Sequence, residues 1–209
     1  MRQKSVRAIL AHRVKSYAFT DKWADNFGFP EVGSKWLVWG PSASGKSSFV
    51  MQLAKYMSQF GRVEYYADEE GVNAKSLQMR LDRYNMKSCG GRFAVLDQAS
   101  YEEIVERMEK PRSSAIYIFD SFQTMNFTIE QFRGLCKRFP RKTMIWVSRE
   151  ERGEPAGQSA RKAKYDCDVK IHVKGYSAKC LGRFIPDAGK EFVIWEEGYY
   201  NLLKGIETI

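Results

Sequence analysis

One octapeptide combines a lysine, hydroxyl side chains and glycines at the spacing that phosphate binding requires. Residues 40–47 read GPSASGKS and satisfy the pattern GxxxxGKS, directly after the apolar run 36–39. The glycines let the backbone curl until successive N–H groups point at phosphate oxygens, and the helix expected next adds the positive end of its dipole. In this pattern Lys46 reaches the β- and γ-phosphates, and the hydroxyl of Ser47 binds Mg²⁺. The predicted nucleotide-binding residues are Gly40, Pro41, Ser42, Ala43, Ser44, Gly45, Lys46, Ser47 and Ser48.

The alternative for this segment is a Ser/Gly turn with a surface lysine. An apolar strand before the motif and a helical pattern after it, at 49–60, favour the phosphate-binding loop.

Carboxylates stand at the ends of two further apolar runs. The run 115–119 ends in Asp120, and an aspartate there can hold Mg²⁺ through the water shell of the metal. The run 62–67 ends in an Asp-Glu-Glu triplet, in which we expect Glu69, and Glu70 as second choice, to orient and deprotonate an attacking water. The alternatives are a strand-capping aspartate and an acidic turn that caps the next helix.

A polar residue, Ser148, ends a third apolar run, 143–147. In sheets of this kind the end of this strand presents a polar side chain toward the γ-phosphate. We therefore add Ser148 to the expected catalytic residues as a sensor of the nucleotide.

Strand and helix patterns alternate from residue 35 onward and predict an α/β fold. This order builds βαβ units and a doubly wound, mostly parallel sheet with helices on both faces. Ligands of such sheets bind at the carboxyl ends of the strands. After Ser148 we expect a polar loop at 149–164 and then an antiparallel C-terminal extension. The predicted strands are 35–39, 62–67, 93–96, 114–119, 143–147, 167–173, 181–185 and 191–196, and the predicted helices are 46–60, 73–85, 101–110 and 129–139.

Residues 1–34 form an N-terminal region in this scheme, and residues 35–209 form the core. A helical stripe within 5–17 predicts a short amphipathic helix that covers its own core; packing on a neighbouring subunit or on nucleic acid is the alternative. The aromatic segment 19–33, punctuated by Gly and Pro, predicts an ordered loop. The stripe consists of Val6, Ile9, Leu10, Val14 and Tyr17.

Composition favours a polyanionic partner and a reducing compartment. The 209 residues include 34 Lys+Arg against 25 Asp+Glu, a net charge of +9 that attracts phosphate groups. The four cysteines form no CxxC pair and the two histidines add no ligand cluster, so we expect no zinc site, no disulfide framework and a cytoplasmic location. No apolar run approaches the ~20 residues of a membrane span. The basic N-terminus also resembles an organelle transit peptide, which is the alternative location.

Several short motifs together resemble the bacterial RadA (Sms) branch of the RecA-like ATPases. DSFQTM at 120–125 is similar to the DSIQT of that branch, YYADEEG at 65–71 to its strand that ends in two glutamates, and VSRE at 147–150 to its VTKE. The similarity covers residues 35–173 in the same order. It implies a RecA-like fold that hydrolyses ATP with Mg²⁺.

By this resemblance Lys46 and Ser47 bind the nucleotide and its metal, Asp120 binds the metal, and Glu69 activates water. The DNA-facing loops of the family correspond to the segments after Asp120 and after Ser148. In the first of these loops two rings, Phe122 and Phe127, either stack on bases or pack in the core. In the second, contacts to a DNA backbone are implied for Arg149, Arg152, Arg161, Lys162 and Lys164.

The chain also departs from that branch. It lacks the four-cysteine zinc module and the C-terminal protease-like domain, and the KNRFG motif is only loosely matched at 179–184. Arg183 is the first candidate for a cation inserted into the ATP site of a neighbour, and Lys179 is the second. A residue that acts in trans requires a homo-oligomer, either a ring or a filament.

Three functions fit these observations. We expect an ATP-hydrolysing protein of RecA type that binds single-stranded DNA in recombination, repair or replication. The alternatives are a RecA-fold regulator that uses ATP to switch a protein partner without binding DNA and, less favoured, a P-loop phosphotransferase acting on a small molecule. The two loops, the positive charge and Glu69 favour the first, although a fold does not fix a function.

Overall fold

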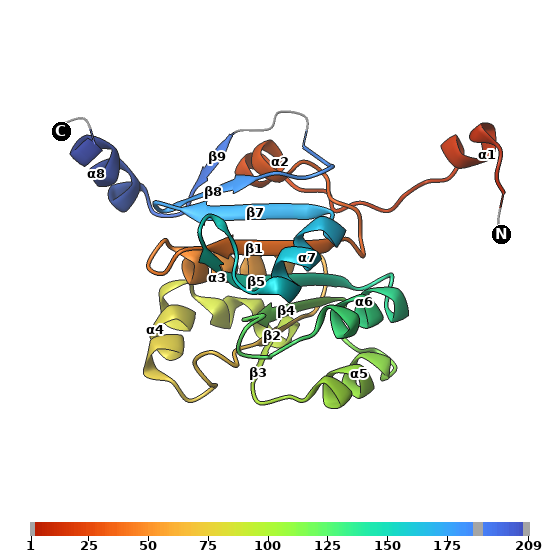
Figure 1. The fold of residues 1–209 in the computed structure, drawn as a ribbon, viewed down its shortest axis with the longest axis horizontal. Helices are drawn as coiled ribbons and strands as arrows, with labels where there is room; N and C mark the ends of the chain where they lie inside the picture. The colour runs from red at the N-terminus through yellow and green to blue at the C-terminus, as the bar shows by residue number, and fades with distance from the viewer. Residues whose placement is uncertain (1–2, 186–189, 207–209) are drawn as a thin grey trace.

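The apolar runs of the sequence become the strands of one large sheet (Figure 1). The computed structural model describes residues 3–185 and 190–206, and the ends of both predicted regions, at 1–2 and 207–209, lie outside the described residues. Within the described part the sheet has nine strands in the order β3-β2-β4-β5-β1-β7-β8-β9, with β6 paired to β5. The strands are β1 Lys35–Gly40, β2 Val63–Tyr66, β3 Phe93–Leu96, β4 Ile116–Asp120, β5 Thr143–Glu151, β6 Glu154–Pro155, β7 Val169–Lys174, β8 Ser177–Cys180 and β9 Glu191–Val193.

The strands from β3 to β7 along this order are parallel, and β8 and β9 are antiparallel. Helices cover both faces, as the alternation of patterns predicts. The described helices are α1 Val6–Leu10, α2 Asp21–Phe27, α3 Lys46–Met57, α4 Lys75–Arg83, α5 Tyr101–Glu109, α6 Ile129–Arg138, α7 Gln158–Asp166 and α8 Glu196–Ile206, with a 3₁₀ segment η1 at Met86–Arg92.

Strand β1 shows how the two faces are filled. Trp36 and Val38 belong to a core cluster beneath α2, α3 and α4, whereas Leu37 and Trp39 belong to a second cluster beneath α5, α6 and α7. Successive side chains of a strand point to opposite faces, so an unbroken apolar run is needed where both faces are buried. All six residues of β1 are buried.

The register of the parallel strands aligns their carboxyl ends. Trp39 pairs with Ser148 across β1 and β5, and Asp120 pairs with Val147 across β4 and β5. The polar residues that follow these strands therefore emerge at one edge of the sheet, where the phosphate-binding motif also lies.

The N-terminal region differs from the sequence prediction in two respects. Helix α1 has five residues instead of thirteen and lies away from the sheet, so the prediction that it covers its own core is wrong (Figure 1). One turn of helix offers too little apolar area to hold itself against the body; Val6 is 72% exposed and Leu10 is 81% exposed. The segment 19–33 contains helix α2, whose Trp23 and Phe27 pack on the sheet.

Two tight turns explain the remaining differences. The predicted loop 149–164 is wrong, because β5 and β6 form a hairpin through Arg152–Gly153 and α7 follows it. The predicted strand 181–185 is also wrong, because β7 turns at Gly175–Tyr176 into β8. All four turn residues have positive φ, as in a type I′ turn. Each turn has one glycine, but its other residue, Arg152 or Tyr176, is of a type that is rare at positive φ, so the sequence signal is weak. Helix α8 was likewise not predicted.

Candidate functional site

The phosphate-binding motif joins β1 to α3. Gly45 has φ +92°, a left-handed conformation that L side chains rarely adopt, and it directly precedes the first residue of the helix. At Gly40 an added Cβ would lie 2.0 Å from the carbonyl oxygen of Val173, so the strand approaches β7 too closely for a side chain. The turn after β7 holds the loop in place, because the N–H of Tyr176 donates to the carbonyl of Ser44 at 3.0 Å.

Four of the residues predicted to act in catalysis or metal binding line one cavity of about 490 Å³, which we call the phosphate cavity. They are Lys46 and Ser47 from the loop, Glu69 from the segment after β2 and Asp120 from the end of β4. The Nζ of Lys46 donates to the carbonyl of Gly40 at 3.2 Å. Burial lowers the pKa of Lys46, and the Asp120 carboxylate opposes that shift. Of the other loop residues, Ser42, Ala43, Gly45 and Ser48 also line the cavity, whereas Gly40, Pro41 and Ser44 shape the loop around it.

Asp120 is buried, and one hydrogen bond offsets part of the cost of burying its carboxylate. Tyr65 donates its hydroxyl to Oδ2 at 2.5 Å. Burial raises the pKa of Asp120 to about 6, while the hydrogen bond from Tyr65 acts in the opposite direction and the charge of Glu69 adds to the rise. A cation bound nearby would stabilise the ionised form of a carboxylate buried in this way.

The donor set fits Mg²⁺ and a triphosphate. Asp120 and Ser47 contribute a carboxylate and a hydroxyl to the same cavity, and oxygen is the ligand that Mg²⁺ prefers. The hydroxyl of Ser44 is buried without a hydrogen-bond partner in the described chain. The first N–H groups of α3 have no partner within the helix and can bind an anion.

The two glutamates after β2 have different surroundings. Glu69 is exposed at the rim of the phosphate cavity, where Oε1 accepts from Nη2 of Arg149 at 3.0 Å. Glu70 accepts from Nη2 of Arg80 at 2.5 Å and from the hydroxyl of Ser76 at 2.8 Å. It lines a smaller adjoining cavity of about 90 Å³, which Glu69 lines as well. Glu69, the first choice of the sequence, therefore lines the phosphate cavity, and Glu70, the second choice, does not.

Ser148 is fully buried and does not line the phosphate cavity. Its hydroxyl accepts from Nε2 of Gln123 at 2.8 Å and donates to the carbonyl of Arg149. Gln123, which the sequence prediction missed, also accepts from the N–H of Arg149 and donates to the carbonyl of Ala156. This side chain ties the segment after β4 to the β5–β6 hairpin.

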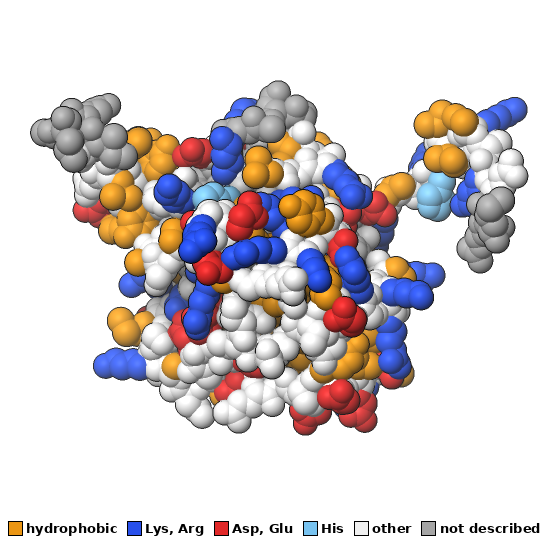
Figure 2. All heavy atoms as spheres, in the orientation of Figure 1, with side chains coloured by type: hydrophobic (Ala, Val, Ile, Leu, Met, Phe, Trp, Pro, Cys, Tyr) orange, Lys and Arg blue, Asp and Glu red, His pale blue; other side chains and the backbone are white. Residues whose placement is uncertain are grey.

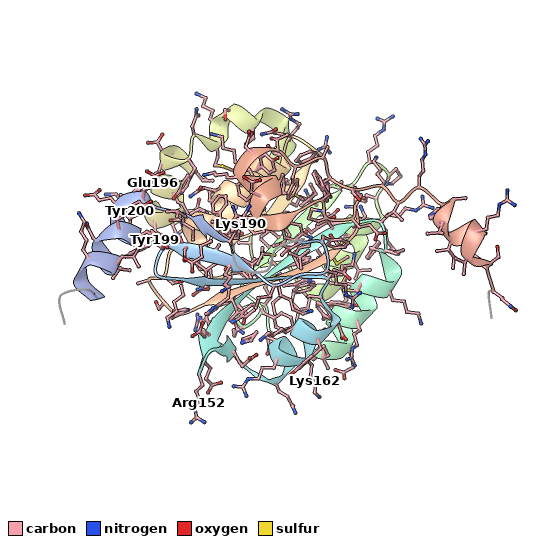
Figure 3. All side chains as sticks on the ribbon, turned by 90° about the horizontal axis from the view of Figure 1, so that it is seen from above. Arg152, Lys162, Lys190, Glu196, Tyr199 and Tyr200 are labelled. Carbon is pink, nitrogen blue, oxygen red and sulfur yellow. The ribbon has the colours of Figure 1, made fainter. Side chains whose placement is uncertain are left out.

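The expected DNA-contacting cations lie on folded elements, and three of them form ion pairs. Arg149 pairs with Glu69, Arg161 with Glu151 and Lys164 with Glu154. Lys and Arg side chains on this face alternate with carboxylates instead of forming one basic patch (Figure 2). Arg152 and Lys162 make no ion pair within the described chain, and both point away from the body (Figure 3).

The aromatic residues of the other expected DNA loop belong to the core. Phe122 is 3% exposed and Phe127 is 4% exposed, and both pack against Trp146. Of the two alternatives at these positions, the structure supports core packing.

Arg183 lies at the opposite edge of the sheet from the phosphate cavity. Its Nη1 is 3.3 Å from Oδ1 of Asp168, and the same carboxylate accepts from the N–H of Lys35 at the start of β1. The first candidate finger is thus remote from the nucleotide site of its own chain. The second, Lys179, is exposed on β8.

A second cavity, of about 580 Å³, adjoins the phosphate-binding loop; we call it the aromatic cavity. It shares Gly45, Ser48, Arg83 and Tyr176 with the phosphate cavity. No sequence motif predicts this cavity, because its walls also come from α4, the β7–β8 turn and the segment after β9. Its other lining residues are Tyr84, Ile194 and Trp195.

Two kinds of feature are absent from the described part of the chain. No group of three or more His, Cys, Asp or Glu side chains there is arranged to hold a metal ion. In residues 3–185 and 190–206, no helix has the length and apolar character that crossing a bilayer would take.

Comparison with known proteins supports the fold. No family model matches the sequence, and no curated protein sequence matches it. The structure is similar to that of the flagellar accessory protein FlaH from Methanocaldococcus jannaschii, with TM-score 0.62, 16% identity and coverage of 86% of this chain and 93% of that one. It is also similar to the KaiC-like protein PH0186 from Pyrococcus horikoshii OT3, with TM-score 0.59, 14% identity and the same two coverages.

At these identities the likeness shows the fold alone. The chain has a RecA-like α/β fold with a mostly parallel sheet and antiparallel C-terminal strands, which confirms the predicted fold class. Neither neighbour singles out the RadA branch within that fold.

Proposed function

We propose that this chain binds ATP with Mg²⁺ and hydrolyses it. The observation that carries this proposal is the convergence of Lys46, Ser47, Glu69 and Asp120 on the phosphate cavity, from three segments far apart in the sequence. The adjoining aromatic cavity has the apolar walls that a nucleobase needs. The RecA-like fold of the structural neighbours supports the same conclusion by analogy.

In this mechanism each residue has a distinct task. Lys46 and the N–H groups at the start of α3 bind the phosphates and stabilise the negative charge that develops on them in the transition state. Glu69 accepts the proton of the attacking water, and Arg149 keeps the carboxylate at the cavity rim. Ser47 and Asp120 would hold Mg²⁺, which when bound neutralises phosphate charge.

Phosphate release from ATP tests the proposal. We expect the purified chain to release phosphate in the presence of Mg²⁺ and without any added acceptor, which also separates hydrolysis from phosphotransfer. Chelating the metal should abolish release. If the protein binds a fluorescent ATP analogue but releases no phosphate from ATP, it is a nucleotide-binding module and the proposal that it hydrolyses ATP is refuted.

For the partner we propose single-stranded DNA, bound through the exposed cations of the β5–β6 hairpin and α7. The support is narrower than the sequence suggests, because only Arg152 and Lys162 of the five expected cations have no ion-pair partner in the described chain. The net charge of +9 adds long-range attraction.

Fluorescence anisotropy with a labelled oligonucleotide tests this partner. Alanine at both Arg152 and Lys162 should weaken binding and lower the salt dependence by ~1 unit of slope per lost phosphate contact. Alanine at both Lys137 and Arg141, exposed cations outside this surface, is the matched control. If the chain shows no salt-sensitive binding, the regulator of a protein partner becomes the better reading.

A further inference from the structure

Helix α4 brings an arginine to the phosphate cavity that neither the motifs nor the resemblance pointed to. Leu77 of α4 is buried in the core and fixes one face of the helix. Arg80 lies three residues further on, one turn along the same face. Its side chain is 16% exposed, and it lines the phosphate cavity together with Lys46, Ser47 and Asp120.

The guanidinium of Arg80 is held on one side and free on the other. Nη2 donates to Oε1 of Glu70 at 2.5 Å, and Glu70 is itself held by the hydroxyl of Ser76. Nη1 is buried and has no hydrogen-bond partner among residues 3–185 and 190–206. A buried N–H without an acceptor is costly, so an unpaired one on a residue that lines a cavity calls for a ligand that supplies the acceptor.

The chemistry of the cavity indicates which acceptor that is. Lys46 and the start of α3 already mark where the β- and γ-phosphates bind. A planar guanidinium fixed by a carboxylate on one edge presents its remaining donors in a set direction, and phosphate oxygens match that geometry. Nothing comparable holds for Arg183, which lies at the other edge of the sheet.

We propose that Arg80 is a catalytic residue that donates from Nη1 to the γ-phosphate of ATP bound by the same chain, and that Glu70 positions it. This inference rests on the proposed ATPase function. Water attacks the γ-phosphorus, the bond from phosphorus to the β–γ bridging oxygen breaks with its electron pair remaining on ADP, and the proton of the water goes to Glu69. Arg80 transfers no proton; it offsets the charge that spreads over the γ-phosphate oxygens.

Substitution of Arg80 separates this role from a structural one. For Arg80→Ala we expect kcat for phosphate release to fall ~10²–10³-fold while KM changes only a few-fold, because the contact strengthens in the transition state. The complex of ADP with aluminium fluoride, a mimic of the transferring phosphoryl group, should lose affinity, whereas ADP alone should bind as before. An Arg80→Ala variant with wild-type kcat would overturn the proposal.

Two further variants keep the test decisive. Arg80→Lys can still pair with Glu70, so it guards against a folding defect; it lacks the second edge of the guanidinium and should still lose at least ~10-fold in kcat. Arg107→Ala is the matched control, because Arg107 pairs with the buried carboxylate of Glu64 at 2.9 Å and does not line the phosphate cavity. It should lower the melting temperature and leave kcat unchanged.

Mixing two inactive variants shows whether Arg80 acts within its own chain. In a mixture of Arg80→Ala and Lys46→Ala proteins, no chain holds both residues at one site, so we expect no recovery of hydrolysis. Recovery would mean that Arg80 acts on a neighbour and would overturn the cis assignment.

The outcomes also separate this inference from the proposed function. If the wild-type chain releases no phosphate, or if Lys46→Ala releases it at the wild-type rate, the ATPase proposal fails. If both behave as expected and Arg80→Ala matches the wild type, only the role of Arg80 fails.

Discussion

Two lysines flank strand β1, and only one of them faces a cavity. Lys35 begins the strand and donates to the carbonyls of Gly33 at 2.6 Å, Phe139 at 3.3 Å and Lys142 at 2.5 Å. Lys46 follows the strand, donates to one carbonyl at 3.2 Å and lines the phosphate cavity. Burial lowers the pKa of both.

The comparison teaches that burial and a lowered pKa do not mark a functional lysine. An ammonium group has three donors. At Lys35 the protein supplies three acceptors, which leaves nothing for a ligand. At Lys46 it supplies one and leaves open space beside the rest. Unused donors next to a cavity are the feature that separates a site from a structural contact, and Arg80 shows the same feature.

The largest expected effect is on catalysis, at the cavity lysine. Lys46→Ala should reduce phosphate release by at least ~10²–10³-fold, because it removes a preorganised charge at the phosphates. The free energy of unfolding should change by less than ~1 kcal/mol, since one hydrogen bond is lost. Phosphate release and urea unfolding on the same preparation check both statements. Undiminished turnover would contradict the role of the phosphate-binding loop.

The second largest effect is on kcat, and it should differ between the two glutamates that follow β2. Glu69→Gln should lower kcat ~10²–10⁴-fold and leave ATP affinity within a few-fold, because the general base is lost and the binding groups remain. Single-turnover hydrolysis and equilibrium binding of a fluorescent ATP analogue measure the two quantities. Glu70→Gln should act on kcat only through Arg80 and hence less strongly; the reverse ranking would exchange their roles.

The third effect is on stability, at the other lysine. Lys35→Met should lower the free energy of unfolding by about 2–4 kcal/mol, because three carbonyls lose their donor and buried acceptors without partners are costly. Affinity for ATP should stay unchanged. Lys137→Met, at an exposed lysine of α6, is the control in the same urea titration and should have little effect. A large loss of ATP affinity in Lys35→Met would contradict the purely structural role that distinguishes Lys35 from Lys46.

The smallest effect is the pH dependence that Lys35 contributes. Its pKa in the folded state lies below the ordinary value of 10.5 because burial disfavours the charged form. Between the lowered folded pKa and 10.5 the unfolded chain binds more protons, so this group makes stability rise with pH in that window. Wild type should therefore gain stability relative to Lys35→Met as pH rises toward 10.5. Parallel pH curves for the two proteins would count against the shift.

Features that depend on residues adjacent in the chain could be predicted without the structure. The phosphate-binding loop could be predicted because eight consecutive residues set its geometry. The apolar runs predicted β1, β2, β4 and β5 because both faces of those strands are buried. The ends of these runs also located Asp120 and Glu69. The hairpin turns at Arg152–Gly153 and Gly175–Tyr176 were missed because one residue of each turn, Arg152 or Tyr176, has a positive φ angle that its residue type does not predict.

Which polar groups already have partners could be learned only from contacts across the fold. Arg149, Arg161 and Lys164 look like free cations in the sequence, yet each is paired with a glutamate, and Phe122 and Phe127 lie in the core. Arg80 reaches the phosphate cavity because α4 packs through Leu77, a contact between segments that no local pattern encodes. Hydrogen-bond partners depend on distances across the fold, and those distances are set by packing.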